Sequence, residues 1–135
     1  MDKKVGIWID KTRANIISFI DNKPKATLLK SQIETYHPKG GSRSKTPYGP
    51  VITVKEKSFL EREKRQHKLF FDQIWNIVKE KDAMVIIGPS QMKEELVLYI
   101  NKRKGPKPQI ISVQSADSMT DNQIVAVIKD MLHHI

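Results

Sequence analysis

The chain has 135 residues, no cysteine and a formal net charge of +9. This length fits one domain with a single core. The absence of cysteine excludes disulfides, zinc ribbons, iron–sulfur clusters and thiol catalysis. The positive charge favours a polyanionic partner such as nucleic acid, with an ordinary basic protein as the alternative.

The first apolar segment, Val5–Ile9, is too short for a signal-peptide core or a membrane span. We therefore expect no membrane partner and, without an export signal, a cytoplasmic protein. No linker or internal repeat divides the sequence, so residues 1–135 are predicted to form one domain.

Three strands are predicted in the first quarter of the chain. They are the apolar run Val5–Ile9, the partly alternating Ala14–Ile20, and Ala26–Tyr36. Turns of hairpin length separate them at Asp10–Arg13 and Asp21–Pro24, so the chain begins as a β-meander.

A long basic loop follows at residues 37–57, with a possible short strand at Val51–Val54. Connections of this length are usually functional or disordered. Glycines adopt positive φ readily and let backbone N–H groups approach phosphate. The loop is therefore the first candidate RNA-binding site, unless its glycines only turn the chain. Its candidate residues are Lys39, Gly40, Gly41, Ser42, Arg43 and Lys45.

A long helix is predicted to begin at Ser58, where Ser58 and Glu61 form a capping-box pattern. Its free N–H groups would add partial positive charge beside the loop. The early turns of this helix carry a second group of candidate phosphate-binding residues: Arg62, Lys64, Arg65 and Lys68. The alternative is that they form an ordinary solvated face. The core-facing positions recur at spacings of three and four: His67, Phe70, Phe71, Ile74, Trp75 and Val78.

The apolar run Ala83–Ile87 predicts a strand covered on both faces, and Ser90 is predicted to cap the next helix. Core residues of that helix are expected at Met92, Leu96, Tyr99 and Ile100. The loop after it is a third candidate RNA-binding site, or only a solubilising turn, through Lys102, Arg103 and Lys104.

The last strand is predicted at Gln109–Val113. Thr120 and Gln123 then form a capping box at the start of the final helix. The buried stripe of that helix is expected to contain Ile124, Val127, Ile128 and Met131.

The predicted order βββαβαβα indicates an α/β fold. It predicts a mixed sheet with helices on both faces, as in RNase H-like folds.

The segment Gly40–Ser42 lies in a basic loop before a long helix, and early turns of that helix read Glu63–His67. This arrangement resembles the middle domain of the eukaryotic and archaeal class-1 peptide chain release factors and their rescue relative Pelota. The later runs Ile86–Pro89 and Ser115–Thr120 resemble those of small bacterial proteins grouped with that superfamily.

The resemblance implies a ribosome or tRNA partner. In release factors the corresponding loop carries Gly-Gly-Gln and helps water attack the peptidyl-tRNA ester. Here Ser42 stands at the glutamine position, as a departure from that motif. Pelota acts in rescue without cutting the ester, so the expected function is binding without efficient hydrolysis. Ester hydrolysis through the Gly-Gly-Ser loop is the enzymatic alternative.

Two further alternatives are a metal-dependent nuclease of the RNase H type and a module that binds acidic proteins. A nuclease would use Asp10 at the end of the first strand, but two-metal chemistry needs several converging carboxylates. The predicted fourth strand contains none. We therefore expect Asp10 to be a turn residue, His67 to be a packed histidine, and the protein to hold no metal or cofactor.

Overall fold

A computed structural model describes residues 3–32 and 54–134 of the chain. Within these ranges the element order is βββαβαβα, which confirms the predicted α/β class. The elements are β1 (Lys4–Ile9), β2 (Arg13–Ile20), β3 (Lys23–Lys30), α1 (Val54–Val78), β4 (Ala83–Gly88), α2 (Met92–Asn101), β5 (Gln109–Ser115) and α3 (Asp121–His133).

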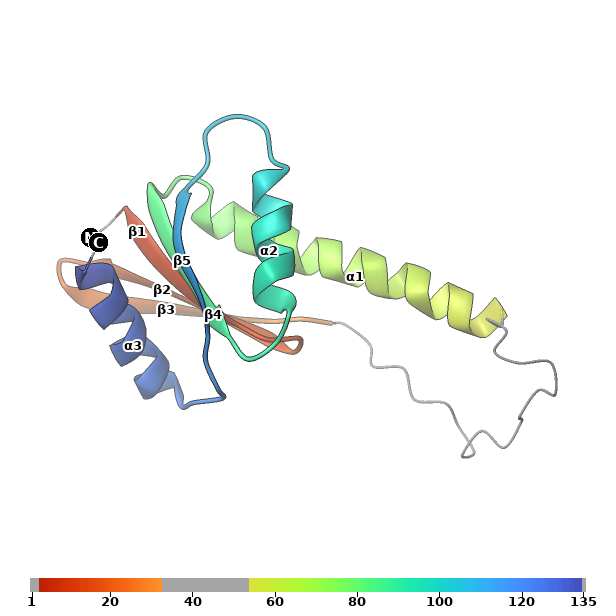
Figure 1. Ribbon diagram of the computed structural model, residues 1–135, viewed down its shortest axis with the longest axis horizontal. Coiled ribbons are helices and arrows are strands. Elements are labelled where there is room, and N and C mark those ends of the chain that lie inside the picture. Colours follow the sequence, from red (N-terminus) through yellow and green to blue (C-terminus); the bar gives the residue numbers. More distant parts are fainter. Residues whose placement is uncertain (1–2, 33–53, 135) are drawn as a thin grey trace.

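The strands form one mixed sheet in the order β3-β2-β1-β4-β5 (Figure 1). The hairpin pairs β1–β2 and β2–β3 are antiparallel, whereas β1–β4 and β4–β5 are parallel. The position of β1 in the middle of the sheet explains its uninterrupted apolar sequence, because both of its faces are covered. The mixed sheet is as expected, and the finer RNase H-like assignment stays a prediction.

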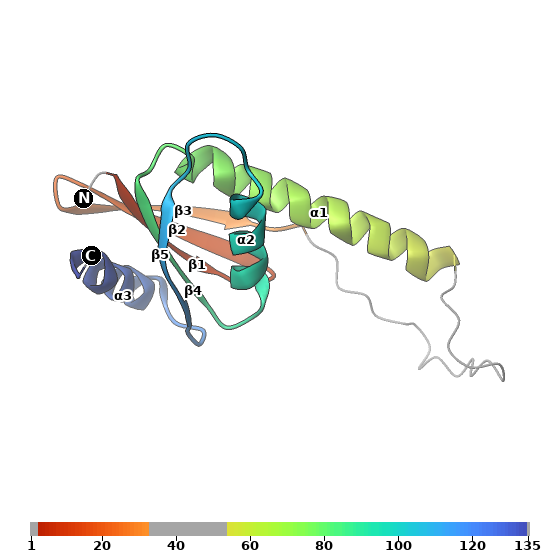
Figure 2. The ribbon, with the colours of Figure 1, turned by 45° about the horizontal axis from the view of Figure 1, so that its top comes forward.

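Helices pack on both faces of the sheet (Figure 2), which confirms the predicted layers. On one face, α1 and α2 share a core with side chains that include Ile7, Phe70, Ile74, Met84 and Leu96. On the other face, α3 covers Trp8, Ile17, Phe19, Val85 and Ile87.

The β2–β3 hairpin is tighter than predicted. Asp21 and Asn22 form a two-residue turn with φ angles of 53° and 66°, in which Asn and Asp are tolerated. The third strand therefore begins at Lys23 rather than Ala26, and it ends at Lys30. Pro24 lies in that strand, which is possible because β3 is an edge of the sheet. The rest of the predicted strand, from residue 33, lies outside the described residues.

The prediction for the start of α1 is wrong. The helix begins at Val54, so Ser58 lies inside it and the Ser58–Glu61 pattern caps nothing. The four residues before Ser58 contain no glycine or proline, and the helix continues through them. The partial positive charge predicted at Ser58 is consequently absent. The short strand predicted at Val51–Val54 is wrong at Val54, because that residue is the first of the helix.

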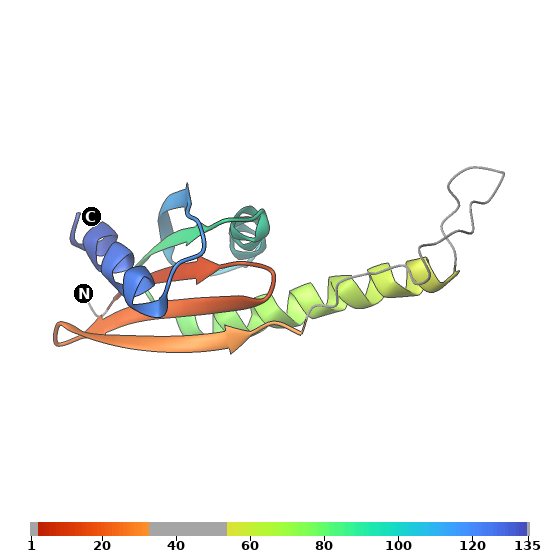
Figure 3. The same cartoon turned by 90° about the horizontal axis from the view of Figure 1, so that it is seen from below.

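The first turns of α1 project beyond the sheet (Figure 3). Of the apolar positions predicted for its later half, Phe70, Phe71, Ile74 and Val78 are buried, while Trp75 is partly buried against the same core. In the described parts of the chain, no helix combines the length and the apolar character needed to span a membrane.

The two later helices begin differently. The N-cap of α2 is Gln91, whose side chain makes no capping hydrogen bond, while the Ser90 hydroxyl accepts a 3.3 Å bond from the N–H of Met92. The capping box of Thr120 and Gln123 at α3 is confirmed.

The buried stripe of α3 is partly different from the prediction. Ile124 and Ile128 are buried as predicted, but Val127 is 37 % exposed and Leu132 is buried. The stripe follows a four-residue spacing, because it is one narrow line of the helix that faces the sheet.

Candidate functional site

The predicted glycine loop lies outside the described residues, so the arrangement of its candidate residues stays a prediction. These residues are Lys39, Gly40, Gly41, Ser42, Arg43 and Lys45. The hydrolytic alternative depends on the same loop and is equally untested.

The second candidate group lies on α1, and its members are all exposed. We call Arg62, Lys64, Arg65 and Lys68 the α1 cations. Three of them recur at three-residue intervals and therefore neighbour one another along the helix surface. The first turns of α1 extend past the sheet (Figure 3), and all four side chains are exposed to solvent.

Asp72 joins the α1 cations to helix α2. The Lys68 ammonium lies 3.2 Å from one carboxylate oxygen of Asp72, and the Tyr99 hydroxyl donates a hydrogen bond to the other. The Arg103 guanidinium stacks over the Tyr99 ring, 4.0 Å from its centroid. The structure thus brings together Lys68 and Arg103, which belong to two separate predicted groups.

The charge states at this junction follow from its contacts. The hydrogen bond from Tyr99, supported by Lys68, holds the pKa of Asp72 below its ordinary value. Burial, together with the hydrogen bond to Asp72, raises the pKa of Tyr99 to about 12. At neutral pH one carboxylate therefore lies between two cations, and the local charge remains positive.

The third candidate group lies in the loop after α2, and we call Lys102, Arg103 and Lys104 the loop cations. Lys107 fixes this loop, because its ammonium donates 3.1 Å bonds to the carbonyl oxygens of Asn101 and Arg103. Such a cation compensates the unpaired carbonyls at the end of a helix. The loop is therefore held by its own contacts while Lys102 and Lys104 remain exposed.

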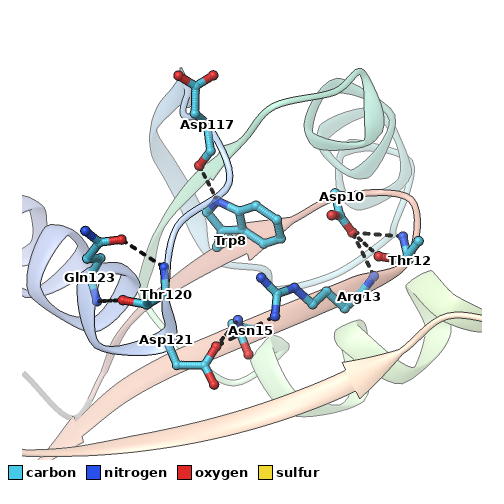
Figure 4. A network of polar contacts seen from close by, with 9 residues as sticks. All are labelled: Trp8, Asp10, Thr12, Arg13, Asn15, Asp117, Thr120, Asp121 and Gln123. Atoms are coloured by element: carbon cyan, nitrogen blue, oxygen red, sulfur yellow. Dashed lines mark hydrogen bonds and ion pairs between the residues drawn. The ribbon is translucent and has the colours of Figure 1, made fainter.

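Asp10 is a turn residue, as predicted. One of its carboxylate oxygens accepts bonds from the Thr12 N–H (2.8 Å), the Thr12 hydroxyl (2.9 Å) and the Arg13 N–H (2.9 Å) (Figure 4). In residues 3–32 and 54–134, no three acidic, histidine or cysteine side chains gather to hold a metal ion. The nuclease alternative gains no support from this part of the chain.

A polar network next to Asp10 was not predicted from the sequence. Arg13 stacks over the Trp8 ring, 4.9 Å from its centroid, and lies 3.8 Å from the carboxylate of Asp121 (Figure 4). Buried Asn15 is within 3.4 Å of the same carboxylate. The Trp8 indole N–H donates to the Asp117 carbonyl oxygen at 3.4 Å. These contacts hold the start of α3 against β1 and β2.

His67 lies between two carboxylates rather than in a purely apolar contact. Its two ring nitrogens are 3.8 Å from Glu63 and 3.6 Å from Glu95, and its ring meets Phe71 edge-on. The predicted packed role is correct, because the imidazole links α1 to α2.

Comparisons with known proteins give no match, either to a protein-family model or to a curated protein. The resemblance to the middle domain of release factors therefore stays a prediction. The α/β fold and the contacts around Asp72 are the observations on which a functional proposal can rest.

Proposed function

We propose that the protein binds ribosomal RNA or tRNA through the phosphate backbone, in a cytoplasmic rescue-like role without efficient ester hydrolysis. One observation carries the proposal: Lys68 of the α1 cations and Arg103 of the loop cations lie on either side of Asp72 and Tyr99. This contact joins two basic segments that are separate in the sequence, and it supports a phosphate-binding surface that includes both.

The chemistry of this surface suits phosphate better than an acidic protein. Arg and Lys side chains on an exposed helix contact successive phosphates without reading base sequence. Asp72 compensates only part of the charge, because its single carboxylate lies between Lys68 and Arg103. The net charge of +9 would steer a polyanion to the molecule over longer distances.

A matched pair of triple variants tests the proposal, with each variant removing three positive charges. The test variant changes three α1 cations to glutamine and leaves the Lys68–Asp72 pair intact: Arg62, Lys64 and Arg65. The control variant changes three exposed lysines that lie outside the basic surface and outside both edge strands to glutamine: Lys3, Lys79 and Lys129.

Affinity for tRNA by fluorescence anisotropy, and for ribosomes by co-sedimentation, is measured at several salt concentrations. We expect the test variant to lose about tenfold or more in affinity, with a shallower salt dependence, because each lost phosphate contact reduces the slope by about 1. The control should lose much less. Equal losses in both variants would mean that net charge alone explains the lower affinity. A wild-type protein that does not bind at low salt would contradict the proposal.

A further inference from the structure

The two edges of the sheet have opposite chemical characters. Strands β3 and β5 end the strand order, and the outer side of each is paired with no strand of residues 3–32 and 54–134. An unpaired edge offers a row of N–H and C=O groups to another strand. Natural edges are normally protected against such pairing by charge or proline.

Strand β3 is a protected edge. It contains three exposed lysines and a proline within eight residues: Lys23, Pro24, Lys25 and Lys30. The lysines would repel an identical strand placed beside them, and Pro24 has no N–H to donate.

Strand β5 has none of these protections. Its sequence Gln-Ile-Ile-Ser-Val-Gln-Ser contains no charged residue and no proline, and it is rich in residues that favour strands. Two of its apolar side chains remain accessible, with Ile111 38 % and Val113 37 % exposed. A register shift leaves Ile111 without a partner on β4, but Ser112–Ser115 pair regularly with Val85–Gly88. The irregularity of β5 is therefore at Ile111, and Ser112 begins its regular pairing with β4.

We propose that β5 pairs with β5 of a second copy of this chain, in the antiparallel direction and around a two-fold axis. The two five-stranded sheets would then continue into each other. An uncharged strand can face its own copy without repulsion between like charges, which β3 cannot do. A closed two-fold contact also occupies both unprotected edges and leaves none for further growth.

The charges that flank β5 favour a copy of the chain over a foreign strand. Lys107 lies two residues before the strand and Asp117 two residues after it. If the axis passes through Ser112, the middle of β5, Lys107 of each copy comes opposite Asp117 of the other. The same register places Ile111, which is left out of the pairing with β4, opposite Val113 of the other copy.

Single-cysteine variants test the register, because the chain has no cysteine of its own. In the proposed dimer the two Ser112 residues face each other, with Cα atoms about 4.5–5.5 Å apart, which lies within the range of Cα separations that disulfides span. We expect Ser112→Cys to form a covalent dimer under mild oxidation. The control, Thr27→Cys on the protected edge, should stay monomeric under the same conditions.

Sedimentation equilibrium of the full chain tests the association itself. We expect a concentration-dependent dimer whose dissociation constant rises about tenfold or more in Val113→Lys, because two new lysines would meet in the interface. Leu28→Lys on β3, at a side chain 47 % exposed, should leave the constant unchanged. Circular dichroism checks that each variant is folded. If a lysine variant does not fold, oxidation of Ser112→Cys and Thr27→Cys still tests the dimer independently. A wild-type chain that stays monomeric at all concentrations, or a dimer that Leu28→Lys weakens equally, would overturn the proposal.

Discussion

The contacts of single side chains at the junction of α1 and α2 have consequences for stability. Asp72 and Tyr99 are 27 residues apart and belong to different helices, yet the hydroxyl of one donates to the carboxylate of the other. The bond links two helices that otherwise share an apolar contact between Phe71 and Tyr99, whose ring centroids are 5.5 Å apart. It also keeps Lys68 and Arg103 at fixed positions on either side.

Replacing Tyr99 by Phe removes the hydroxyl and keeps the ring. We expect the free energy of unfolding at neutral pH to fall by about 1 kcal/mol, a value reduced for the partial exposure of both groups. Urea denaturation of the variant and the wild type measures the difference. An unchanged free energy would show that water replaces this hydrogen bond without cost.

The same pair predicts how stability depends on pH. The pKa of Asp72 is lowered in the folded state, so its contribution is present above its ordinary pKa of 3.8 and is lost as pH falls through the folded value. The pKa of Tyr99 is raised to about 12, so its contribution is present below 10.0 and is lost as pH rises towards 12. The difference between wild type and Tyr99→Phe should therefore be largest near neutral pH and shrink at both extremes. A difference that stays constant across this range would contradict the assignment.

Gly88 and Gly105 differ in the space that surrounds their Cα atoms. At Gly88 an added Cβ would collide with the backbone carbonyl oxygen of Ile9, which cannot move without disturbing β1. At Gly105, with φ of 87°, an added Cβ meets nothing within 4 Å. We expect Gly88→Ala to lower the free energy of unfolding by about 3 kcal/mol. Gly105→Ala should cost about 1 kcal/mol, from its backbone angle alone. Equal costs in urea denaturation would refute the proposed collision.

Among the elements, α1 and α3 show how similar sequence patterns have different structural outcomes. Both Ser58–Glu61 and Thr120–Gln123 fit a capping box, but only the second begins a helix. The difference lies in the preceding residues. Ala116–Met119 lead directly out of β5, whereas the residues before Ser58 are compatible with a helix and extend it.

Alanine substitutions at the two positions distinguish a cap from a helix interior. Thr120→Ala should lower the free energy of unfolding by about 1 kcal/mol, because the N–H of Gln123 loses its acceptor. Ser58→Ala should change it by less than about 0.5 kcal/mol, in the stabilising direction, since alanine is the better helix former. Thermal or urea denaturation measures both. A comparable loss in the two variants would mean that Ser58 also caps a helix.

At the scale of the molecule, residues 3–32 and 54–134 form a five-stranded sheet with a separate core on each face. One face and one edge of this sheet are proposed to have different functions. The α1–α2 face supports the basic surface around Asp72, while the outer edge at β5 is proposed to contact a second copy. A dimer through β5 uses none of the α1 cations, which belong to a different element, so we expect them to remain accessible to RNA.

Local patterns in the sequence were sufficient for much of the fold. The apolar runs Val5–Ile9 and Ala83–Ile87, and the capping box at Thr120, depend on neighbouring residues alone, so they predict elements and their order correctly. The ends of helices were less predictable where no glycine or proline interrupts the sequence, as before Ser58. The pattern of α1 likewise predicts which residues face the core and which cations face outwards.

The tertiary structure alone decided which residues meet. Asp72 with Tyr99, and Asn15 with Asp121 over 106 positions, are contacts between distant segments, and such contacts leave no periodic trace in either segment. The same holds for the edges of the sheet. Only the strand order reveals that Pro24 lies where a missing N–H is harmless and that the uncharged β5 lies at the other edge. Sequence determines local conformation through neighbouring residues, whereas strand order depends on packing of the entire chain.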